Sequence, residues 1–180
     1  MSKAFVATAN PASSDNPSVV VLKDPLFAAF LGWLIPGLGH LYQGRTAKGL
    51  LFMVCILSTF FFGLFISEGK AVYAWWSPDD WRLPYLCQLG VGLPATPALV
   101  QSYLVRGGKP PILGGFMAPP ADSRELDSWY KELNHYLELG IVYTMIAGLL
   151  NILAVYDAWG GPVELEESSE KKRAPEPATG

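Results

Sequence analysis

Four long apolar runs alternate with polar segments along the chain. They cover residues 25–42, 47–66, 85–105 and 138–158, and charged side chains occur only at their margins. A helix that crosses a membrane needs about 20 predominantly apolar residues. The pattern therefore predicts an all-α, polytopic membrane protein with about four transmembrane helices.

Two of these runs contain residues that interrupt a straight helix. Pro36 removes a backbone hydrogen bond near the end of the run 25–42, which is also short for a span. The run 85–105 contains Gly90, Gly92, Pro94 and Pro97. We expect a kinked span there, with a re-entrant segment as the alternative, because neighbouring helices can satisfy the freed backbone groups.

An amphipathic helix is predicted over residues 122–137, immediately before the last span. Asp122 and Glu125 have the spacing of a capping box, and apolar side chains then recur at helical spacing. A continuous helix over 123–159 would be about 55 Å long, whereas the hydrocarbon core is about 30 Å thick. Its first half must therefore protrude or bend into the interface.

The ends of the chain differ in composition from its centre. Residues 1–22 are rich in Ser, Ala, Asn and Pro, and residues 160–180 form a charged tail. Neither segment has enough apolar surface to order itself, so we expect a flexible N-terminal segment and a disordered tail. They flank a transmembrane helical domain over residues 23–159.

Small residues mark two predicted helix-packing faces. One face carries Ala28 and Gly32, and the other carries Gly140, Thr144 and Gly148 at intervals of four. Small side chains let the backbones of membrane helices approach closely. We predict that the two faces pack against each other.

Composition and charge exclude several classes of protein. Hydrophobic residues make up 51% of the 180 residues and charged residues only 16%, against about 25% charged in a typical soluble domain. The net charge of −3 argues against a nucleic-acid partner. Two cysteines provide neither a disulfide framework nor zinc-ligand spacing, and no cofactor is expected.

The first two runs are joined by the glycine-rich turn PGLGHLYQGRTAKG. It resembles the hairpin of the two-transmembrane-helix (TM-two) domain family, within an uncharacterised bacterial membrane protein family. The turn lacks the arginine common there, and an extra span precedes Asp157, which would be the closing aspartate. The resemblance implies a membrane location, a cytoplasmic turn and no enzyme activity. The turn residues are Pro36, Gly37, Gly39, His40, Tyr42, Gly44, Arg45 and Gly49.

Few residues could carry chemistry. With four spans, the first turn and residues 106–137 would share one side, so His135 and Glu138 could hold a metal together with His40. The better use of Glu138 is an ion pair with Arg45 or Arg106 at the membrane edge. Asn151, deep in the last span, is expected to form an interhelical hydrogen bond.

These observations favour a non-enzymatic integral membrane protein that packs or scaffolds through its helices. Its partners would be the lipid bilayer and a second copy or another membrane protein, and its place a bacterial inner membrane, crossed several times. Lys and Arg counts do not decide the orientation. The resemblance suggests a cytoplasmic hairpin with both termini outside. The alternatives are a small transporter or channel subunit and a membrane-embedded enzyme acting on lipid.

Overall fold

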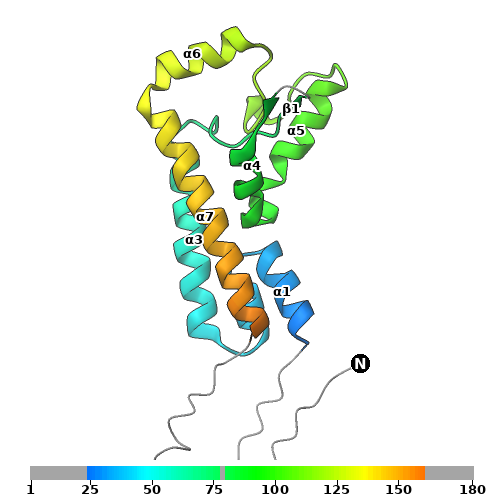
Figure 1. The fold of residues 1–180 in the computed structure, drawn as a ribbon, viewed down its shortest axis with the longest axis vertical. Helices are drawn as coiled ribbons and strands as arrows, with labels where there is room; N and C mark the ends of the chain where they lie inside the picture. The colour runs from blue at the N-terminus through cyan, green and yellow to red at the C-terminus, as the bar shows by residue number, and fades with distance from the viewer. Residues whose placement is uncertain (1–23, 78–79, 161–180) are drawn as a thin grey trace, which may run out of the picture.

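The computed structural model describes residues 24–77 and 80–160 as a mainly α-helical fold with one pair of two-residue strands (Figure 1). The predicted helical class is confirmed. The flexible segment 1–22 and the charged tail lie outside the described residues, except that Gly160 ends the last helix. The elements are α1 (Pro25–Leu34), α2 (Leu38–Tyr42), α3 (Thr46–Ile66), β1 (Trp76–Ser77), β2 (Asp80–Trp81), α4 (Leu83–Gln88), η1 (Leu89–Val91), η2 (Leu93–Ala95), α5 (Pro97–Arg106), η3 (Leu113–Gly115), α6 (Ser123–Leu133) and α7 (His135–Gly160).

Two long antiparallel helices, α3 and α7, form the axis of the molecule (Figure 1). They contain 21 and 26 residues and are predominantly apolar. At 1.5 Å per residue they are about 32 and 39 Å long, so each is long and apolar enough to cross a membrane. They correspond to the predicted spans 47–66 and 138–158.

The first predicted span, 25–42, is not a single helix. Helix α1 ends at Leu34, Ile35 is extended, and Gly37 has a φ of 82°. Pro36 cannot donate a helical hydrogen bond, and the left-handed angle at Gly37 reverses the chain. Helix α2 then folds back on α1, with Gly39 against the carbonyl group of Ala28. The segment is a short helical hairpin, and its longer helix, α1, is about half as long as α3.

The third predicted span, 85–105, is also divided. The chain passes through α4 and η1, turns at Gly92 with a φ of 86°, and returns through η2 and α5. Figure 1 shows α4 and α5 on the same half of the molecule. Gly92 lies against the backbone of Trp33, so the tips of the two short hairpins meet. The segment therefore reverses direction instead of forming one kinked helix, and the four-span arrangement is not confirmed.

The amphipathic helix and the last long helix are separated by a bend. Helix α6 begins with the predicted cap, because Asp122 accepts a hydrogen bond of 2.8 Å from the Glu125 amide. Asn134 has a φ of 49°, and α7 starts at the next residue. Helix α6 therefore crosses the end of the bundle instead of extending α7 (Figure 1). The structure thus has a bend at Asn134 between the two parts of the predicted helical stretch, whereas a position of α6 in the membrane interface stays a prediction.

The two predicted packing faces do not face each other. Gly140 lies against Gly63 and Ser67 of the α3 end, and Gly148 lies against Cys87 of α4. Helix α1 instead packs on the other half of α7, where Gly32 touches Val155. The prediction was wrong because α1 is too short to reach the Gly140 end.

Candidate functional site

The glycines of the turn allow three segments to meet at one end of the bundle. Gly37 lies against the backbone of Gly49 at the start of α3, and a side chain there would also approach the Met53 amide to 3.0 Å. At Gly39 a methyl group would lie 3.2 Å from Ala158 of α7. The spacing of these glycines thus brings α2 against both long helices.

Asp157 gathers the polar side chains of this end, and we define the Asp157 cluster as Asp157, His40, Arg45 and Lys48. The His40 Nε2 donates to Asp157 Oδ2 at 2.7 Å, and Lys48 Nζ lies 2.6 Å from the same oxygen. A guanidinium nitrogen of Arg45 lies 3.5 Å away. In addition, Gln43 donates from its side-chain amide to the Ala158 carbonyl group. The cluster fastens the turn to the end of α7.

Burial decides the charge of the cluster. His40 is only 1% exposed, whereas the Asp157 and Lys48 side chains are each 37% exposed. Desolvation lowers the pKa of His40 below its usual 6.5, and the contact with Asp157 only partly offsets this effect. A neutral His40 leaves one carboxylate between two cations. The Asp157 cluster is therefore a half-buried group of ion pairs with a net positive charge.

A second polar node lies where the two hairpin tips meet. The buried Asn151 amide donates to the Gly32 carbonyl at 3.1 Å and to the Gly90 carbonyl at 2.9 Å. Both acceptors lie close to helix breaks, where backbone groups lose their regular partners. Asn151 therefore links both hairpins to α7, which is an interhelical hydrogen bond of the kind expected for it.

Gln88 and Thr144 form a further buried link. The Gln88 amide donates to Thr144 Oγ1 at 2.9 Å and to the Ala71 carbonyl at 3.1 Å. Thr144 thus contributes a hydrogen bond as well as a small packing surface. Most buried polar groups must be paired in this way, since an unpaired one costs about 1–3 kcal/mol.

The structure separates the residues of the suggested metal site. His135 begins α7 and Asp157 lies near its end, about 33 Å apart at 1.5 Å per residue. His40 therefore lies far from His135 and Glu138, and exposed Glu138 cannot reach Arg45. The prediction assumed that the turn and residues 106–137 share one end. Within residues 24–77 and 80–160, no group of three or more His, Cys, Asp or Glu could hold a metal.

The Asp157 cluster could be read only in part from the sequence. The resemblance suggested Asp157 as the closing aspartate, but no pattern paired it with His40 or Lys48. The available signal was a single acidic residue at the end of the last apolar run and three basic or imidazole side chains in the first turn. Pairing them requires knowing that the turn and the end of α7 coincide.

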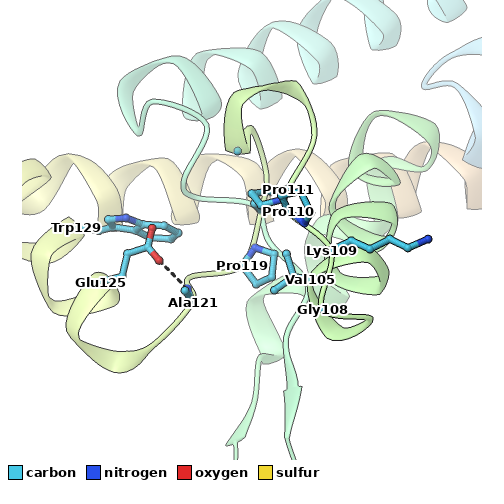
Figure 2. A pocket seen from close by; sticks show the side chains of 11 residues that line it. Val105, Gly108, Lys109, Pro110, Pro111, Pro119, Ala121, Glu125 and Trp129 are labelled. Atoms are coloured by element: carbon cyan, nitrogen blue, oxygen red, sulfur yellow. Dashed lines mark hydrogen bonds between the residues drawn. The ribbon is translucent and has the colours of Figure 1, made fainter.

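A cavity lies at the opposite end, between α5, the loop 107–121 and α6 (Figure 2). Its volume is about 530 Å³, within the usual range of ligand pockets. Figure 2 shows Lys109 pointing away from it and Glu125 bonded to the Ala121 amide, so these charges are not directed into its centre. The lining is mostly apolar: Val105, Gly108, Lys109, Pro110, Pro111, Gly115, Ala118, Pro119, Ala121, Glu125 and Trp129.

Comparison with known proteins gives one match. A family model described as "Family of unknown function (DUF6677)" matches residues 27–171, which include both short hairpins and both long helices. Neither the curated proteins nor the solved structures yielded a match. The expectation of an uncharacterised family is supported, whereas the TM-two hairpin stays a resemblance.

Proposed function

This chain belongs to the family of unknown function DUF6677, and we propose from its own geometry that it is an integral membrane protein with a non-enzymatic, scaffolding role. It would cross the membrane twice, through α3 and α7. The short hairpins α1–α2 and α4–α5 would enter from opposite faces and meet in the interior. A bacterial inner membrane is the proposed location.

The observation that carries this proposal is an apolar belt, defined as the exposed apolar side chains of α1, α3 and α7. Within the 18-residue apolar stretch of each long helix, only 28% of α3 and 33% of α7 is buried. Soluble monomers rarely expose contiguous apolar patches larger than a few hundred Å². The belt residues are Leu26, Phe27, Phe30, Trp33, Leu50, Leu51, Val54, Phe61, Phe62, Phe65, Tyr136, Leu139, Val142, Tyr143, Ile146, Leu149, Leu150, Ile152, Leu153, Tyr156 and Trp159.

The hairpin tips are compatible with a lipid environment because protein groups satisfy their backbone. Irregular backbone at membrane depth is tolerated only where protein or a water-filled cavity surrounds it. Asn151 supplies hydrogen bonds to the carbonyl groups of Gly32 and Gly90. Two spans would place the turn at 43–45 on one face and the segment 107–134 on the other.

Cysteine labelling tests this arrangement. In a chain whose two native cysteines are replaced by alanine, Thr46→Cys and Arg124→Cys are placed at exposed positions of opposite ends. In sealed vesicles of one orientation, an impermeant maleimide should label only one of them from outside. Labelling of both from the same side would favour four spans and refute the two-span arrangement. Extraction of the native chain from membranes by alkaline carbonate would refute membrane embedding altogether.

The scaffolding role is supported by how the deep polar side chains are used. Asn151 and Gln88 donate their amide hydrogens to the chain's own backbone or to Thr144. The outer surface is left to apolar contacts with lipid, with a second copy or with another membrane protein. Energy transfer between labelled copies in vesicles tests self-association. Transfer that persists as lipid is added in excess supports an oligomer, whereas transfer that falls to the level of random encounters excludes one.

A small channel or transporter subunit is the second candidate. The observation in its favour is the pair of half-depth hairpins meeting at Asn151, since broken helices that meet near the midplane form the binding sites of many transporters. Ion and solute flux into vesicles containing the purified protein tests this function. Flux abolished by Asn151→Leu would favour the transporter over the scaffold.

A further inference from the structure

Apolar exposure continues beyond the end of α3, onto the loop that contains η3. Ile112, Leu113 and Phe116 are 48%, 70% and 40% exposed, and Phe65 at the end of α3 is 81% exposed. These side chains lie at the end of the bundle where α6 also lies. A loop surrounded only by water would gain nothing by presenting three large apolar side chains.

The loop is packed directly onto the end of the belt. The Phe116 ring covers Gly69, where a side chain would approach ring atoms to 3.0 Å or closer, and the Met117 amide donates to the Gly69 carbonyl at 3.3 Å. A groove of about 440 Å³ lies between the loop and α3, lined by Phe61, Leu64, Phe65, Glu68, Gly69 and Phe116. Phe116 therefore lines the same groove as Phe61 and Phe65 of the belt, where Glu68 is the one charged lining residue.

A buried glutamine holds this loop in place. Gln101 of α5 is 1% exposed, and its amide donates to the carbonyl groups of Ile112 and Phe116 at 2.6 and 2.9 Å. Its oxygen accepts from the Ile112 amide at 3.0 Å. Both ends of the loop are thus clamped by one side chain.

The backbone between the clamped ends turns sharply. Leu113, Gly114 and Gly115 have φ angles of 54°, 65° and 83°, in the left-handed region. Such angles are unfavourable for leucine, so the surrounding structure must impose this conformation. The exposure of Ile112 and Leu113 is a fixed feature of the fold rather than a loose excursion of the chain.

We propose that the segment Ile112–Phe116 is a membrane-interface anchor, whose partner is the boundary between headgroups and acyl chains of the adjoining leaflet. An acyl chain would lie in the groove against Phe61 and Phe65. Exposed Lys109, which points away from the cavity (Figure 2), lies a few residues away on the same loop, where headgroup phosphates would attract it. This inference rests on the proposed membrane embedding, because it adds the surface of Ile112–Phe116 to the lipid-facing belt.

Spin-label accessibility tests the anchor against matched controls. In the cysteine-free chain, reconstituted in vesicles, a nitroxide is attached at Leu113→Cys, at Leu153→Cys on the belt, or at Arg124→Cys on exposed α6. Oxygen should enhance the spin relaxation of the Leu113 label almost as strongly as that of the Leu153 label. A water-soluble nickel chelate should enhance the relaxation of the Leu113 label several-fold less than that of the Arg124 label. A Leu113 label as accessible to nickel as that at Arg124 would overturn the anchor.

Two other outcomes are distinguishable. Shielding of the Leu113 label from both reagents would mean that protein covers the loop, which also overturns the anchor. Nickel access at Leu153 would overturn the membrane embedding itself. As a check that needs no cysteine replacement, a benzophenone amino acid at position 113 of the otherwise native chain should form lipid adducts on illumination. Adducts with protein alone would contradict the inference.

Discussion

Helix α7 packs closely on the second hairpin at Gly148, and the substitution Gly148→Ala tests this contact. A methyl group at this position would overlap the carbonyl oxygen of Cys87 and lie 2.9 Å from the carbonyl carbon, where ordinary contacts begin at 3.4 Å. The obstructing atoms are backbone, so no side-chain rotation can relieve the overlap. Helix α4 would have to move away from α7.

Two opposing effects decide the outcome of Gly148→Ala. Alanine is favoured over glycine in a helix interior by about 1 kcal/mol, which would stabilise α7. Overpacking a tight contact costs typically about 1–3 kcal/mol, and the backbone overlap places this site at the upper end. We expect a net loss of about 1–2 kcal/mol in the free energy of unfolding, the difference of these two effects. For a chain of this size, that corresponds to a fall of roughly 2–8 °C in Tm.

Thermal unfolding in a mild detergent, followed by intrinsic tryptophan fluorescence, measures this change. The matched control is Gly160→Ala at the end of the same helix, where no atom lies within 4 Å of the added methyl group. The control should leave Tm nearly unchanged. If Gly148→Ala instead raised Tm, the helix preference alone would be acting, and the packing of α4 on α7 described above would be refuted.

Three further predictions concern the polar nodes. Asp157→Asn should lower the free energy of unfolding in detergent by about 1 kcal/mol, a modest loss because the carboxylate is partly exposed and solvent screens its ion pairs. An unchanged Tm would contradict a stabilising role of the Asp157 cluster. The pKa of His40 is lowered in the fold, so below pH 6.5 the folded chain binds fewer protons than the unfolded chain. The contribution of His40 to the free energy of unfolding is therefore complete above pH 6.5 and is lost as the pH falls below it. A Tm measured from pH 7.5 to 5 should therefore fall more steeply in the native chain than in His40→Gln. Asn151→Leu removes two hydrogen bonds, to Gly32 and Gly90, and should cost about 1–2 kcal/mol; limited proteolysis should show faster cleavage near the hairpins, and unchanged rates would argue against the link.

Local chemistry was sufficient to predict several elements. The apolar runs at 47–66 and 138–158 form α3 and α7 because uninterrupted apolar residues of this length favour a single helix. Asp122 caps α6 by accepting a hydrogen bond of 2.8 Å from the Glu125 amide, as the spacing of these two residues predicts. These features depend on neighbours in sequence, so the pattern of residues carries them.

The two short hairpins show where sequence reasoning stopped. Pro36 and Gly92 identify places where a helix is weakened, but a kinked span and a reversal share the same local signal. The choice depends on what the freed backbone groups meet. Here Asn151, more than 50 residues from either break, provides the hydrogen bonds that make both reversals tolerable.

By itself the sequence determined the helical class, the two long apolar helices, the capped amphipathic helix and the need for a bend before α7. The tertiary structure alone decided that His40, Arg45 and Lys48 meet Asp157, and that His135 and Glu138 lie at the other end. The physical reason is that burial and pairing depend on how many times the chain crosses the bundle. A segment that turns back, instead of crossing the bundle, leaves the residues after it at the end from which it started. Every residue that follows is then placed at the opposite end from the one that a crossing would give.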